Sequence, residues 1–304
     1  MKNNFNKHAD YRHCLAQGAK FCSRKSSKLA IVLAGGLSLL LMLNVAMASL
    51  SSTKHNLGST GIAVNKFSGT TEICVFCHTP HGANNSVAKP APIWNRGFAA
   101  SSAYTTYDSL GTTSFDATAA PTGSVSLACL SCHDGTQAMN VMINTPGSGT
   151  VTTLSGTWSG ANQTGGQING SFTRIGVDLT NDHPVSIQYG GGGVSDSTLT
   201  GATLDPYFAQ AVNSNTPNKR VGSAIGQVGT RLLKNNTRVW WVETNGTAGQ
   251  QKDDLPLYSR TDLGTNQPFV ECASCHDPHS NNTTFLRLPT GNESSGVCLT
   301  CHIK

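Results

Sequence analysis

One five-residue pattern, C-x-x-C-H, recurs four times in this 304-residue chain. Two thiols held one short turn apart can add to the two vinyl groups of a porphyrin, while the histidine that follows binds its iron. A single chance match is expected on the order of 0.01 times in such a chain, so we expect four covalently bound c-type haems. We number the motifs 1 to 4 in chain order. The attachment cysteines are Cys74, Cys77, Cys129, Cys132, Cys272, Cys275, Cys298 and Cys301, and the proximal iron ligands are His78, His133, His276 and His302.

Two other chemistries compete for the same cysteines. Four C-x-x-C pairs are enough for two zinc sites of four thiolates each, and a single pair can act as a redox dithiol. Zinc sites do not require a histidine after every second cysteine. A thioredoxin-like dithiol needs a βαβ pattern, which none of the four motifs has around it. Haem attachment is therefore the stronger interpretation.

Eight histidines lie after residue 48, and four remain once the four proximal ligands are set aside, which equals the number of distal iron positions. Neutral imidazole is a good iron ligand, and two imidazoles per iron leave no open position for a substrate. This count favours an electron-transfer protein over an enzyme. The candidate distal ligands are His55, His81, His183 and His279.

Each candidate distal ligand has a simpler alternative. His81 and His279 follow a proximal histidine by three residues, so each must bind a neighbouring haem or remain a solvated loop residue. His183 can instead be a turn residue bonded to Asp182. His55 lies on an N-terminal segment, and such segments are often mobile.

Four other residues beside the motifs could act on the haems. Met139 and Met142 are alternative axial ligands that would raise a haem potential, although at their spacing from motif 2 we expect them to pack against the porphyrin. Asp134 and Asp277 directly follow a proximal histidine. They are either hydrogen-bonding partners around the iron ligands or solvated turn residues, and the sequence favours neither.

The first 48 residues read as a secretory signal peptide. Leu29 to Val45 are almost wholly apolar, basic residues precede them, and Ala46-Met47-Ala48 fits a small-x-small cleavage pattern. The apolar stretch is shorter than the roughly 20 residues of a bilayer span, so an uncleaved anchor is the weaker alternative. We expect a mature chain that begins near Ser49, has no membrane span and is exported to the outer cell surface, the extracellular space or the periplasm.

Charge argues against a nucleic-acid partner. Seven of the 21 basic residues and one of the 16 acidic residues fall in the first 48 positions, so the remainder carries a net charge of −1. The basic character of the whole chain belongs to the signal peptide.

Composition after residue 48 predicts a thin polypeptide core, because Gly, Ser, Thr and Asn are abundant and long apolar runs are few. The expected fold class is a mostly irregular multihaem cytochrome, with few short helices and short β-strands and with the haems as its core. We expect short strands at 172–179 and 238–243, a turn at 190–193, and short helices near 206–212 and at the motifs. The expected organisation is a cleaved segment 1–48, an N-terminal dihaem segment 49–144, a haem-free middle 145–268 that supplies a distal histidine, and a C-terminal dihaem segment 269–304, with 49–304 as one folded unit.

Several segments carry a resemblance to known proteins: Cys74-Val-Phe-Cys-His-Thr-Pro-His81, Ala91-Pro-Ile-Trp-Asn-Arg96, Asp182-His-Pro-Val185, and Cys272-Ala-Ser-Cys-His-Asp-Pro-His279 with Cys298 to His302. On these residues the chain resembles the doubled C-x-x-C-H multihaem c-type cytochromes, and within them the OmcE-type tetrahaem outer-surface (nanowire) cytochromes. The resemblance implies a bis-histidine protein that polymerises into an extracellular filament and passes electrons to other multihaem cytochromes or metal oxides. It also implies that one distal histidine is donated to the adjacent protomer; His81 is the favoured candidate and His55 the other. The rival functions are a monomeric electron shuttle and a multihaem reductase with one open iron.

Overall fold

The structure is a computed structural model that describes residues 50–84, 91–147, 153–195, 203–209, 228–232, 238–247 and 249–303. The chain divides into two units, Met1–Met47 and Ala48–Lys304, and every described residue belongs to the second. The predicted signal peptide and its cleavage site lie outside the described residues. Within the described ranges, every helix is too short or too polar to cross a lipid bilayer.

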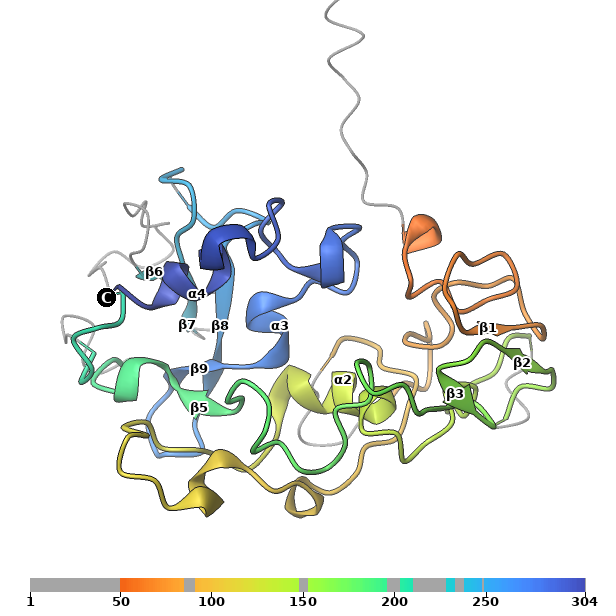
Figure 1. The fold of residues 1–304 in the computed structure, drawn as a ribbon, viewed down its shortest axis with the longest axis horizontal. Coiled ribbons are helices and arrows are strands. Elements are labelled where there is room, and N and C mark those ends of the chain that lie inside the picture. Colours follow the sequence, from red (N-terminus) through yellow and green to blue (C-terminus); the bar gives the residue numbers. More distant parts are fainter. Residues whose placement is uncertain are drawn as a thin grey trace, which may run out of the picture. The chain divides into compact units, whose positions relative to one another are not determined.

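Antiparallel strands and very short helices make up the regular structure of the described residues (Figure 1). The largest sheet has the strand order β5-β9-β8-β7-β6, and two ribbons pair β1 with β2 and β3 with β4. The strands are β1 (Lys66–Phe67), β2 (Trp158–Ser159), β3 (Gln163–Thr164), β4 (Gln167–Ile168), β5 (Ile187–Gln188), β6 (Val228–Leu232), β7 (Arg238–Val242), β8 (Leu255–Arg260) and β9 (Gln267–Val270). The α-helices are α2 (Ser124–His133), α3 (Cys272–Cys275) and α4 (Gly296–Cys301), and the 3₁₀ turns are η1 (Leu50–Ser52), η2 (Ser101–Ala103), η3 (Tyr107–Leu110), η4 (Tyr189–Gly191), η5 (Thr283–Phe285) and η6 (Glu293–Ser295).

The five-stranded sheet carries an apolar core made of polypeptide alone. Trp240 pairs with Leu257 and Val242 with Leu255 across β7 and β8, and all four side chains are buried together with Val297 of α4. β-branched and aromatic residues fit such a pleated, buried surface, so the predicted strand at 238–243 is confirmed. The apolar core on this sheet contains more polypeptide side chains than the composition predicts. That the haems form the core elsewhere stays a prediction.

Two smaller apolar clusters support motifs 1 and 2. Phe67 of β1 packs with Phe76 inside motif 1, and both contact Trp158 of β2. Leu127 and Leu130 place the buried face of α2 in a second cluster. Since α2 ends at the motif 2 histidine, burial of this face fixes where that histidine lies.

The expected strand at 172–179 is wrong. Thr173 and Arg174 amides bond back to the Gly170 carbonyl in a turn, and the Ile175 and Gly176 amides donate to the carbonyl of His133. The backbone groups that would have formed a sheet ladder are therefore used to hold motif 2.

The expected helix near 206–212 is also wrong where the structure describes it. Residues 203–209 form a turn, in which Phe208 makes a one-residue antiparallel bridge to His302; residues 210–212 lie outside the described residues. Motif 1 is likewise a hydrogen-bonded turn and no helix, whereas motifs 2, 3 and 4 are helical as expected. The four-glycine turn at 190–193 is confirmed, since all four glycines have positive φ, a region in which other residues are strained.

Candidate functional site

Motifs 1, 3 and 4 hold their histidine by one shared backbone arrangement. In each, the amide after the histidine donates to a carbonyl of a separate segment, and the amide two residues further along that segment donates back to the second cysteine of the motif. We call these partners the bridging segments, residues 92–95, 284–287 and 206–209. The bonds are Thr79 N to Ile93 O (2.9 Å) with Asn95 N to Cys77 O (2.8 Å), Asp277 N to Phe285 O (2.8 Å) with Arg287 N to Cys275 O (2.9 Å), and Ile303 N to Tyr207 O (2.8 Å) with Ala209 N to Cys301 O (2.9 Å).

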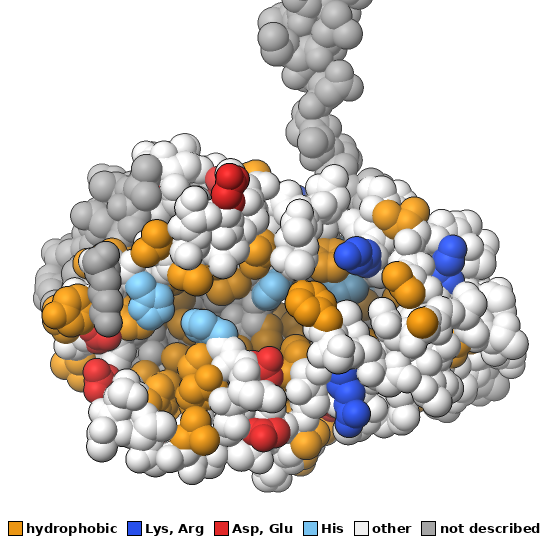
Figure 2. Space-filling model, in the orientation of Figure 1, with side chains coloured by type: hydrophobic (Ala, Val, Ile, Leu, Met, Phe, Trp, Pro, Cys, Tyr) orange, Lys and Arg blue, Asp and Glu red, His pale blue; other side chains and the backbone are white. Residues whose placement is uncertain are grey.

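Large apolar side chains beside the motifs are left uncovered by the polypeptide. Ile93 and Tyr207, each the first paired residue of a bridging segment, are 52% and 55% exposed, and Phe172 near motif 2 is 86% exposed. Figure 2 shows a hollow across one face in which histidine and hydrophobic side chains gather. Exposed apolar patches in a concavity mark a place where another apolar surface binds. A porphyrin face fits this description.

Three motif histidines are oriented by a contact of Nδ1, the outer ring nitrogen, which would point away from a bound iron. Nδ1 of His78, His133 and His276 lies 3.0, 2.7 and 2.9 Å from the carbonyls of Pro92, Thr173 and Thr284 respectively. A carbonyl can only accept, so each Nδ1 carries the proton and each Nε2 keeps a lone pair for a metal.

Two of these carbonyl acceptors lie in strained backbone. Ile93, which follows the Pro92 acceptor, has φ +47°, and Thr284, itself an acceptor, has φ +51°. β-branched residues rarely adopt this left-handed region, and such strain tends to persist at functional sites. The chain therefore holds these carbonyls in place against a local energetic cost.

Two pairs of imidazoles have the centroid separation that an iron bound between them would give. The ring centroids of His78 and His279 are 6.1 Å apart with 20° between planes, and those of His55 and His133 are 6.3 Å apart with 71°. Two metal–imidazole bonds of about 2 Å each, plus half of each ring, place such centroids roughly 6 Å apart. The residues present thus fit a haem iron at motifs 1 and 2. The prediction that His55 and His279 are distal ligands gains this support from the geometry.

His55 is held in place by the segment after motif 3. Its Nδ1 lies 3.2 Å from the Pro278 carbonyl, and its ring stacks on Phe285 at 4.1 Å. Burial, with the nearby His133 adding to it, lowers the pKa of His55 to about 4. The imidazole is therefore neutral near pH 7, which is the form that binds a metal.

His81 and His183 are placed differently. Both are exposed, and across the described residues neither has a ring contact with a motif histidine. Nδ1 of His183 lies 3.0 Å from the Pro184 carbonyl, so this nitrogen contacts the local backbone instead of Asp182, the partner that the alternative interpretation gave it. The carbonyl of His81 accepts bonds from Thr79 Oγ1 at 2.9 Å and Asn144 Nδ2 at 2.8 Å. These bonds fix the backbone at His81 and leave its ring exposed.

The cysteines show which motifs are neighbours. Burial, and then the adjacent Cys132 thiol, raise the pKa of Cys77 to about 12, so motifs 1 and 2 lie together. The Cys129 and Cys272 thiols are close enough for Cys272 to raise the pKa of Cys129, and the Cys272 amide donates to Ser126 Oγ at 3.0 Å, so motifs 2 and 3 lie together. Burial, then Cys272 and Cys298, raise the pKa of Cys275 to about 11, so motif 4 lies beside motif 3. The four motifs therefore lie near one another in chain order.

Residues 267–304 match the family model described as the doubled CXXCH motif. The match covers motifs 3 and 4, and it indicates covalently bound c-type haem and a role in electron transport, features of multihaem c-type cytochromes. No curated protein matches the chain. None of the cysteines at 74–301 forms a disulfide, and the described residues contain no group of three or more His, Cys, Asp or Glu that could hold a metal ion directly. A zinc site of the alternative interpretation needs four thiolates together, and the described residues do not bring four together.

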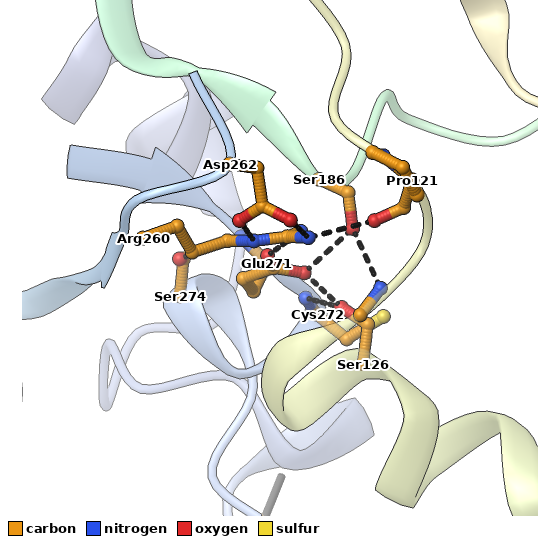
Figure 3. Close-up of polar contacts among 9 residues, drawn as sticks. Pro121, Ser126, Ser186, Arg260, Asp262, Glu271, Cys272 and Ser274 are labelled. Carbon is orange, nitrogen blue, oxygen red and sulfur yellow. Dashed lines mark hydrogen bonds and ion pairs between the residues drawn. The ribbon is translucent and has the colours of Figure 1, made fainter. Parts of the chain in front are cut away.

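A buried polar network joins the helices of motifs 2 and 3 (Figure 3). Glu271, which caps α3 and has a fully buried side chain, accepts from Ser126 of α2 and from Ser186 at 3.0 Å, and pairs with Arg260 at 3.0 Å. Ser126 also accepts the Cys272 amide at 3.0 Å. The carboxylate therefore ties both attachment helices to the sheet.

Asp134 and Asp277 are not solvated turn residues. Asp134 is 2% exposed, and its carboxylate accepts from Tyr104 at 2.9 Å and from the Thr136 amide at 2.8 Å. Asp277 is buried and contacts His279. Met139 and Met142 are each 2% exposed, and Met142 packs with Phe67 and Phe76 inside the polypeptide. That these methionines contact a porphyrin stays a prediction.

Proposed function

We propose that the chain is an exported tetrahaem c-type cytochrome that passes electrons one at a time along its haems to an extracellular acceptor. One observation carries the proposal: four C-x-x-C-H motifs lie near one another in series, and two of them have a second imidazole at the centroid spacing of an axial pair. A bound haem supplies an iron that takes and releases single electrons. Closely spaced haems in a row form a path for electrons, and full imidazole ligation gives a substrate no place to bind.

The residues of the chain hold and orient these groups. The cysteine pairs of each motif form the covalent attachments. His78 with His279 would hold one iron, and His133 with His55 a second. Proximal His276 and His302 would hold the other two, with His81 and His183 as the remaining candidates for their distal positions. The carbonyls that accept from Nδ1 keep each imidazole in the tautomer that binds metal.

Assembly into a filament is part of the proposal, on the strength of the resemblance. Since His55 lies opposite His133 within its own chain, we propose His81 as the histidine donated to the adjacent protomer, with His183 as the second candidate. The exposed ring of His81 on a fixed backbone suits a ligand offered outward. If both histidines reach irons of their own chain, the protein needs no partner and is a monomeric shuttle.

All four irons are expected to be low-spin in the assembled, oxidised protein, because the candidate distal histidines equal the open positions in number. Electron paramagnetic resonance measures the spin state directly, and magnetic circular dichroism separates bis-histidine from His/Met ligation. A substantial high-spin signal would favour a reductase with an open iron. A His/Met charge-transfer band would assign Met139 or Met142 as a ligand.

A further inference from the structure

The two C-x-x-C-H-x-P-H segments of the chain differ in charge at one position. Motif 1 has Thr79 between its proximal histidine and Pro80, and motif 3 has Asp277 at the same place. Both residues stand two positions before a candidate distal histidine. The chain thus contains a charged and a neutral version of the same local structure.

The carboxylate of Asp277 lies beside the imidazole of His279. Its Oδ1 accepts the His279 amide at 2.9 Å and lies 3.7 Å from His279 Nδ1. The Asp277 side chain is 12% exposed and pairs with Lys252, whose Nζ lies 3.9 Å away and whose side chain is 65% exposed. An exposed lysine at that distance offsets only part of the charge, because solvent screens it.

Other imidazoles of the site face neutral groups through the same nitrogen. Nδ1 of His55, His78, His133 and His276 lies against a backbone carbonyl. Thr79, at the matching position of motif 1, is uncharged, and its hydroxyl donates to the carbonyl of His81. His279 therefore differs from these ligand candidates in having a carboxylate beside its outer nitrogen.

We infer that Asp277 lowers the reduction potential of the haem held between His78 and His279. A carboxylate at the outer nitrogen makes an imidazole a stronger electron donor, and a nearby negative charge stabilises the ferric iron over the ferrous iron. The ring of His279 faces His78, so the charge acts on the haem of motif 1 although Asp277 belongs to motif 3. The inference rests on the proposed haem ligation. It assigns the Thr79/Asp277 difference as a source of unequal haem potentials along the chain.

The test is a spectroelectrochemical titration of the exported, haem-loaded protein with paired variants. D277N should raise the midpoint potential of one haem by about 59 mV, which for one electron is a tenfold change in its reduction equilibrium constant. D277T, which copies motif 1, should act alike. K252Q, which strips Asp277 of its counter-charge, should shift the same haem the opposite way and by less. T79D should lower the potential of the haem that His81 serves.

H279A identifies the haem concerned, since its iron becomes high-spin. Unchanged potentials in D277N and K252Q, with four low-spin haems attached, would overturn the inference and leave the proposed function standing. A shift confined to a different haem would overturn it as well. Should D277N fail to load its haems, K252Q decides alone. Missing haems, or high-spin irons in the assembled wild-type protein, would contradict the proposed function itself.

Discussion

Replacing His279 by alanine is expected to leave four haems attached and to turn one iron high-spin, about a quarter of the total. Attachment depends on the cysteines of the motifs, whereas His279 only faces His78 across the iron position at 6.1 Å. H55A should do the same to the iron at His133, because those two rings are 6.3 Å apart. Electron paramagnetic resonance of the assembled variant, compared with the assembled wild-type protein, is the measurement.

H81A and H183A are the matched comparison for these two variants. If His81 is donated to a neighbouring protomer, H81A should yield a folded, haem-loaded protomer with short filaments or none, since the interface loses both a metal bond and the geometry it fixes. Electron microscopy of sheared filaments measures this. Normal filaments with wholly low-spin spectra in both H81A and H183A would show that neither residue coordinates iron across an interface.

Loss of Arg96 is expected to destabilise the fold by at least about 3 kcal/mol. Its guanidinium is fully buried and donates to the carbonyls of Ser131, Ala138, Met139 and Val141 at 2.7 to 3.0 Å. Arg96→Met would leave the carbonyls of Ser131, Met139 and Val141 without the guanidinium donor, whereas that of Ala138 keeps the Val141 amide at 3.1 Å. Each unsatisfied buried group costs about 1–3 kcal/mol. Since Ser131 lies inside motif 2, the variant should also loosen that helix.

Chemical denaturation of the haem-loaded protein measures this effect through the transition midpoint. Arg174→Met, at an exposed arginine, is the control and should change stability by less than about 0.5 kcal/mol. R96K should fall between the two, because a lysine keeps the charge but lacks the planar fork. Equal midpoints for Arg96→Met and the control would refute the role given to Arg96.

Local patterns in the sequence predict local features of the fold well. The strand at 238–243 and the glycine turn at 190–193 follow from β-branched and aromatic residues and from glycine conformational freedom. The segments 172–179 and 206–209 show where such patterns fail. Their backbones pair with motif histidines far away in sequence, and that tertiary pairing overrides their own propensity.

The candidate site divides in the same way. The attachment residues are readable because covalent haem chemistry fixes their types and spacing. The pairing of His279 with His78 is not readable, because it depends on how motif 3 folds over motif 1, about 200 residues away. Glu271 and Ser126 are separated by 145 residues and carry no signature pattern, so their bond also required the structure.

The mass of the intact exported protein tests the central claim most directly. The account predicts a polypeptide that begins near Ser49 and carries four covalently added haems, one on each cysteine pair. A mass with fewer haem additions would contradict the tetrahaem assignment. A chain that retains Leu29 to Val45 would contradict the cleaved signal peptide.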